Sequence, residues 1–88
     1  MQLSFKAASR KRAGASLADL PSGVEAVIDR LDLPDDLASR LMEMGFIPGH
    51  RVSAARSAPG GDPRVFRVDG AEIALRRETA RRILVRNN

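Results

Sequence analysis

Apolar residues between positions 34 and 44 recur with the spacing of an amphipathic helix. Leu37, Leu41 and Met44 stand at i, i+4 and i+7, so a helix places them on one face, which we expect to pack on the core. Pro34 suits a first helical turn, where its missing N–H would have no partner. Two acidic residues follow it, and they favour the positive end of a helix dipole. The pattern therefore predicts one helix that begins at about residue 34.

The residues after this helix predict an abrupt stop and a return of the chain toward the core. Gly45 can take the left-handed conformation that closes a helix C-terminus. Phe46 and Ile47 are then placed to pack beneath the helix. Pro48-Gly49 predicts a turn that leads into the next strand.

Short runs rich in β-branched residues, some with alternating polar and apolar positions, predict five strands. We place these strands at residues 24–31, 51–56, 64–68, 71–76 and 83–86. Asp69-Gly70 separates the third from the fourth, and it predicts a tight hairpin because both residues accept a positive φ. The inward positions expected from the alternation are Ala26, Ile28, Phe66, Val68, Ile73 and Leu75.

The fold class that follows is mainly β with one α-helix. A single helical turn is expected at residues 78–82, and residues 57–63 form an exposed loop. Five short strands in a chain of this size close best as a small, partly open β-barrel, which also removes exposed sheet edges.

The length of 88 residues allows one domain with one core. Residues 1–15 carry basic and small side chains with weak patterning, so we expect a flexible basic N-terminal arm. Leu3 and Phe5 alternate within it and form at most a short strand. The barrel domain is expected over residues 16–88.

The net charge of +4 is distributed unevenly along the chain. The first 12 residues hold four basic residues and no acid, which accounts for the whole excess. Residues 17–50 hold two basic and seven acidic residues, whereas residues 64–88 hold seven basic and three acidic residues. The basic regions favour anionic lipid head groups, nucleic acid or an acidic protein face, unless they are simply a solvated surface.

Several stretches, taken together and in order, resemble the FeoA family over about residues 16–86. They are Leu41-Met42-Glu43-Met44-Gly45-Phe46-Ile47-Pro48-Gly49, Ala58-Pro59-Gly60-Gly61-Asp62-Pro63, Gly70-Ala71-Glu72-Ile73-Ala74-Leu75-Arg76, Glu78-Thr79-Ala80 and Ile83-Leu84-Val85. The resemblance implies an SH3-like barrel. It also implies a small cytosolic accessory protein of bacterial ferrous iron uptake, which regulates or assembles its partner FeoB, a membrane permease with a cytosolic GTPase domain.

Catalysis and an intrinsic metal site are both disfavoured by the residue types present. The chain has no Cys and a single His, so it lacks the base and nucleophile of a hydrolytic triad. Ferrous iron commonly takes grouped His and carboxylate ligands, and His50 at the start of a strand cannot supply such a group. We therefore expect no enzyme activity, no cofactor and no metal site, with His50 as a surface turn residue that at most binds a stray divalent ion.

Localisation follows from two absences in the sequence. No apolar run is long enough to cross a bilayer, and the N-terminus lacks the apolar segment of a signal peptide. A cytoplasmic protein is therefore expected, peripheral to the membrane through its partner, and the sequence leaves a homo-oligomer open.

Two surfaces are candidates for partner binding. The first is the end of the helix with the following turn, represented by Met42, Phe46 and Pro48; methionine suits an adaptable docking surface. The second consists of Arg76, Arg77, Arg81 and Arg82, whose forked donors suit carboxylates on an acidic partner face.

The main alternative to a permease-docking module is a small nucleic-acid-binding barrel with a basic arm. The arginines permit it, but aromatic residues for base stacking are scarce, since the chain has three Phe and neither Trp nor Tyr. The same scarcity argues against a groove for proline-rich peptides. A metal-sensing regulatory domain is a further alternative, but the sequence lacks a ligand cluster for it.

Overall fold

The computed structural model describes residues 15–87, which form five strands, two α-helices and two short 3₁₀ turns. The two helices are unequal in length: α2 has nine residues and α3 has four. In chain order the elements are η1 (Leu17–Asp19), β1 (Glu25–Leu31), α2 (Asp35–Glu43), β2 (Arg51–Ser57), η2 (Pro59–Gly61), β3 (Arg64–Val68), β4 (Ala71–Leu75), α3 (Arg77–Ala80) and β5 (Ile83–Arg86).

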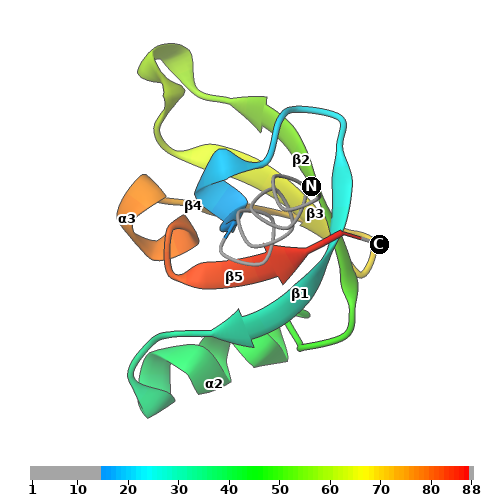
Figure 1. Cartoon of the computed structure of the whole chain (residues 1–88). Coiled ribbons are helices and arrows are strands. Elements are labelled where there is room, and N and C mark those ends of the chain that lie inside the picture. The colour runs from blue at the N-terminus through cyan, green and yellow to red at the C-terminus, as the bar shows by residue number, and fades with distance from the viewer. Residues whose placement is uncertain (1–14, 88) are drawn as a thin grey trace, which may run out of the picture.

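The strands form one curved antiparallel sheet in the order β4-β3-β2-β1-β5 (Figure 1). The outer edge of β5 is met by the chain that leads into η1, since the Val85 N–H donates to the Ala15 carbonyl and Ser16 bridges Leu84. Ala15 therefore belongs to the folded domain, one residue earlier than expected. The rest of the predicted basic arm, including Leu3 and Phe5, lies outside the described residues.

The core lies inside the curve of this sheet. Phe46 and Phe66 are its two largest fully buried side chains, and they come from the segment after α2 and from β3. The expected inward positions on β1, β3 and β4 are buried, except that Ile73 is half-buried. The mainly β, one-helix barrel is thereby confirmed, with α3 a single turn beside it.

The β3–β4 hairpin is built as the sequence predicts. Asp69 and Gly70 have φ values of 52° and 81°, so both central residues of the turn take the left-handed region. The five residue pairs between the two strands run without interruption from Arg64–Leu75 to Val68–Ala71. The hairpin is therefore regular to its tip.

Two side chains at the end of α2 differ from expectation. Met44 is 45% exposed and Ile47 is 36% exposed, although both were expected in the core. The helix ends at Glu43, and Phe46 turns back to fill the core next to Leu41. The Phe46 side chain fills the space beneath the last helical turn, so Met44 and Ile47 remain on the surface.

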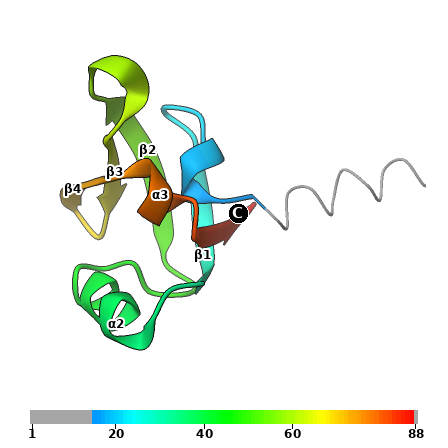
Figure 2. The same ribbon diagram turned by 90° about the vertical axis from the view of Figure 1, so that its left-hand side faces the viewer.

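Figure 2 shows how the elements are distributed over the molecule. Helix α2 lies at one end and the η2 loop lies at the opposite end. The short α3 lies between these ends. The two candidate binding surfaces predicted from the sequence therefore belong to different parts of the fold.

Candidate docking surfaces

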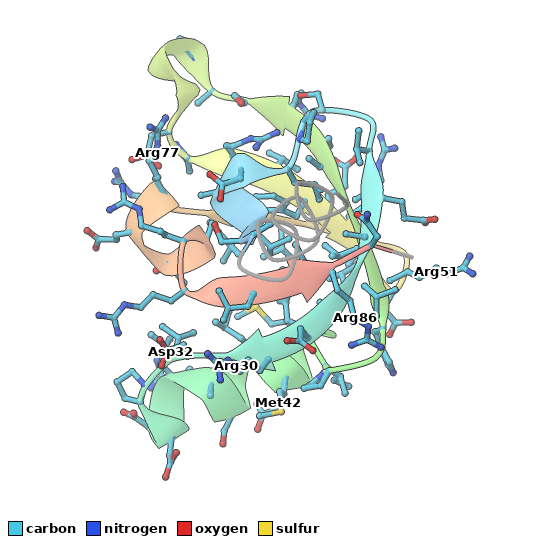
Figure 3. All side chains as sticks on the ribbon, in the orientation of Figure 1. Arg30, Asp32, Met42, Arg51, Arg77 and Arg86 are labelled. Atoms are coloured by element: carbon cyan, nitrogen blue, oxygen red, sulfur yellow. The ribbon has the colours of Figure 1, made fainter. Side chains whose placement is uncertain are left out.

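The first surface is an apolar patch at the C-terminal end of α2, which we call the helix-end patch. Its members are Met42, Met44, Ile47 and Pro48, all exposed. Among the described residues only four large hydrophobic side chains are markedly exposed, and three of them belong to this patch. Figure 3 shows Met42 on the outer side of α2. Exposed apolar side chains so close together in the chain make this end of the helix a candidate interaction site.

Backbone hydrogen bonds hold the helix-end patch in one conformation. The Gly45 N–H donates to the Met42 carbonyl and the Phe46 N–H donates to the Leu41 carbonyl, each at 3.0 Å. This pair is the Schellman closure of a helix, and Gly45 supplies the positive φ of 114° that it needs. The Ile47 N–H then donates to the Gly45 carbonyl at 2.8 Å. The patch is thus presented by a closed turn, so little of its backbone must be ordered on binding.

The tip of the β3–β4 hairpin borders the helix-end patch. A Cβ built on Gly45 would lie 3.2 Å from the Cβ of Asp69 and 3.5 Å from a methyl group of Val68. Asp69 and Glu43 are both exposed, so the apolar patch has acidic neighbours. The helix C-terminus adds the negative end of its dipole. A partner suited to this surface presents apolar side chains with basic residues around them.

Phe46 does not belong to this surface, contrary to the sequence-based hypothesis. Its side chain is fully buried in the core, so its ring cannot touch a partner. Met44 and Ile47 take its place among the exposed apolar residues. The sequence signal that identifies them is their position on either side of Gly45, where the helix has ended and the chain has not yet entered the next strand.

The second surface, which we call the α3 arginine cluster, consists of Arg76, Arg77, Arg81 and Arg82. All four residues are exposed. Arg77 begins α3 and Arg76 and Arg81 cap it, so the whole set spans seven residues. The Arg77 N–H donates to Asp62 Oδ1 at 2.8 Å, which ties α3 to the chain after the η2 loop. The predicted arginines therefore lie on α3 and on the residues directly before and after it.

His50 is exposed and its backbone takes part in the turn that follows Pro48. Its N–H donates to the Ile47 carbonyl, and its carbonyl accepts from the Ile28 N–H. Over residues 15–87 no three side chains of His, Cys, Asp or Glu gather as a metal site would require. In the same range no helix has both the length and the apolar character needed to cross a membrane.

Comparison with known proteins identifies related sequences. The profile of the FeoA domain matches residues 15–87 of this chain. A curated relative from Porphyromonas gingivalis, named as a fusion of Fe(2+) transport protein A with the Fe(2+) transporter FeoB, is 36% identical over 69 residues. That alignment covers 78% of this chain and only 8% of the relative.

Solved structures show the same fold. Iron(II) transport protein A from Clostridium thermocellum matches with a TM-score of 0.77 and 38% identity, covering 82% of this chain and 44% of the other. FeoA from Stenotrophomonas maltophilia, described as a procaryotic SH3 domain protein complexed with zinc, matches with a TM-score of 0.70 and 36% identity. That match covers 80% of this chain and 87% of the other. The SH3-like architecture expected from the sequence is confirmed by these structures.

Proposed function

This chain belongs to the FeoA domain family, and we propose on that basis that it is a cytoplasmic accessory protein of ferrous iron uptake that docks on a FeoB-type permease. The role is binding and not catalysis. The Porphyromonas gingivalis fusion protein supports the partner, because joining two modules in one chain gives them a high effective concentration toward each other. The observation that carries the docking site is the exposed, rigidly held helix-end patch.

The helix-end patch supports docking for a physical reason. Met42 and Met44 are flexible and polarisable, so they adapt to an apolar groove on a partner. Their exposure in the free protein means that burying them on a partner removes apolar surface from water at little cost in backbone order. We place Met42 and Pro48 at the contact, as the sequence suggests, and add Met44 and Ile47.

Capture of a FeoB-type permease tests this proposal. The full chain is immobilised and offered a detergent-solubilised permease from the same cell, with and without guanine nucleotide. Met42→Glu places a charge in the proposed apolar contact, and we expect affinity to fall by about thirtyfold or more, the loss typical of a central interface residue.

The matched control is Val24→Glu. Val24 is also an exposed apolar residue, 42% exposed, but it lies beside β1 and outside the helix-end patch. We expect this variant to bind as the unchanged chain does. Equal losses in both variants would mean that the helix end is not the contact. Absence of capture by the unchanged chain in every nucleotide state would reject direct docking.

A further inference from the structure

The α3 arginine cluster concentrates four exposed arginines within seven residues. Over residues 15–87 no carboxylate lies within 4.0 Å of the charged nitrogens of its four members. Four arginines on the strands have such partners: Arg51 pairs with Glu25, Arg86 with Asp29, and both Arg56 and Arg67 with Glu72. Arg30, Arg40 and Arg64 have none among the described residues either, but they are far apart in the sequence. The cluster thus presents charge that the described fold leaves uncompensated at close range.

The guanidinium groups of these arginines spread over the side of the molecule between η2 and α2, with Arg77 at the η2 end, where its Nη2 would lie 3.2 Å from a Cβ built on Gly61. Arg77 and Arg81 are four residues apart on α3, so their side chains leave the same face of the turn. The Arg82 Nη1 lies 3.5 Å from the Asp32 carbonyl, which places its guanidinium where the chain enters α2. The acids nearest in the chain or by contact are Glu78, Asp62 and Asp32, and the Asp62 carboxylate already accepts the Arg77 N–H.

The shape of this surface limits the ligands it suits. In the part of the chain that the structure describes, no pocket is present that would enclose a small anion. The described Phe side chains, Phe46 and Phe66, are fully buried, so neither offers a platform for stacked bases. Guanidinium groups on an open surface suit a ligand that also presents anionic groups over a surface. Each guanidinium can then donate two hydrogen bonds to one anionic group.

We propose that the α3 arginine cluster binds the anionic phospholipid head groups of a membrane surface. Groups of four to eight basic residues at one site are typical of such binding. Residues 17–50, which include α2, carry the acidic excess. The molecule therefore meets an anionic membrane with α3 toward the lipid.

This binding goes beyond the docking proposed above, because it needs no permease. Its effect would be to hold the protein at the membrane surface, where its concentration near any membrane partner rises. The two proposals are also tested separately, since vesicles of pure lipid contain no permease.

Co-sedimentation with lipid vesicles tests the proposal. The full chain is mixed with vesicles of phosphatidylcholine that contain about a quarter phosphatidylglycerol, a charged surface of the relevant kind. We expect binding that falls steeply as salt is raised, and no binding to pure phosphatidylcholine. The double variant Arg77→Gln/Arg81→Gln should lower the partition coefficient about twenty-five-fold, since each basic residue near the surface contributes about fivefold.

The matched control is Arg51→Gln/Arg86→Gln, which removes the same charge from residues that are ion-paired. Figure 3 shows Arg77 on one side of the molecule and Arg51 and Arg86 on the other. We expect this control to lose less than fivefold. Equal losses in the two double variants would overturn the proposal, because net charge alone would then explain the binding. Thermal unfolding of every variant confirms that each is folded.

Three further results would also overturn it. Displacement from vesicles by inorganic phosphate, beyond that by chloride at the same ionic strength, would indicate a site for a small anion. Tighter binding to a mixed-sequence single-stranded RNA than to the vesicles would assign the cluster to nucleic acid. Failure to bind anionic vesicles, together with loss of permease capture by Arg77→Gln/Arg81→Gln, would assign it to an acidic protein face.

Discussion

Gly45 illustrates how much a single residue decides in this fold. Its φ of 114° closes α2, and its lack of a side chain lets the β3–β4 hairpin approach the helix end. The positive φ and the close approach of the hairpin both require glycine at this position. The position of Gly45 therefore determines where the exposed residues on either side of it lie. The helix-end patch is therefore a consequence of a backbone conformation that residues other than glycine rarely adopt.

Gly45→Ala should destabilise the protein by about 2–3 kcal/mol, because strain at positive φ adds to a close contact with Asp69 and Val68. Gly49→Ala is the matched control, since Gly49 has a φ of 93° but nothing within 4 Å of a built Cβ. We expect it to cost about 1 kcal/mol from backbone strain alone. Urea unfolding measures both, and equal costs would show that the contact is unimportant.

Glu72 provides a second prediction at this scale. The hydrogen bond from the Arg67 Nε, at 2.9 Å, holds the pKa of the Glu72 carboxyl below its ordinary value of 4.5, and the charge of Arg56 acts in the same direction. A carboxyl with a lowered folded-state pKa adds stability above its unfolded-state pKa. That stability should be lost as the pH falls from 4.5 through the lowered value.

NMR titration of the Glu72 side chain measures this pKa directly. Arg67→Met should raise it more than Arg56→Met, because the hydrogen bond from Arg67 is the larger cause. The reverse order would contradict this assignment. Because the Glu72 carboxyl is exposed, we expect a clear shift in its titration curve but only a small change in the free energy of unfolding.

Among the elements, η1 depends on a side chain far away in the sequence. The Arg64 Nη1, from β3, donates to the Leu20 carbonyl at 2.6 Å and to the Ala18 carbonyl at 3.5 Å. Its guanidinium also lies 5.5 Å from the centre of the Phe66 ring. Arg64 therefore ties η1 to the sheet, in addition to the buried Leu17 side chain and the Ser16 cap.

Arg64→Met should therefore destabilise the fold by about 1–3 kcal/mol, since the Leu20 carbonyl loses a charge-assisted donor. The Arg64 Nε is buried without a partner, and its removal offsets part of that loss. Arg67→Met on the same strand is the control, because its ion pair is exposed and should cost less than about 1 kcal/mol. Denaturant unfolding that ranks Arg67→Met as the more damaging change would contradict this role.

On the scale of the whole molecule, the fold separates an apolar surface from a cationic one. The helix-end patch is formed where α2 meets the β3–β4 hairpin, and the α3 arginine cluster lies on a different element that directly precedes β5. A protein arranged in this way can contact a protein partner and a charged surface at the same time. The two contacts should therefore be separable by mutation.

Met42→Glu should lower the affinity for the permease about thirtyfold or more and leave vesicle binding within about twofold, since it adds one charge outside the cluster. Arg77→Gln/Arg81→Gln should do the opposite: binding to vesicles should fall, and capture of the detergent-solubilised permease should be retained. The two assays, run on the same preparations, measure this separation. Loss of both activities in either variant would show that the two surfaces act as one.

The sequence by itself determined the elements of this protein, because each rests on local chemistry. The helix, its glycine stop, the Asp69-Gly70 hairpin and most of the inward strand positions follow from periodicity and from backbone preferences over a few residues. The ordered motifs were also sufficient to indicate the family. The place of α3 was predicted to within one or two residues.

Only the tertiary structure decided which apolar residues at the end of α2 are exposed. Periodicity assigned Met44 to the core, which is wrong, because its side chain is 45% exposed. The expectation that Phe46 packs beneath the helix is confirmed, and its assignment to the docking surface is wrong for the same reason, since its side chain is fully buried. The reason is volume: the space beneath the last helical turn admits one large side chain, and the Schellman turn directs Phe46 into it. The pairing of charges was decided in the same way. Which arginines find a carboxylate depends on strand register and on contacts distant in sequence, so only the fold shows that Arg51, Arg56, Arg67 and Arg86 have one and that the α3 arginine cluster does not.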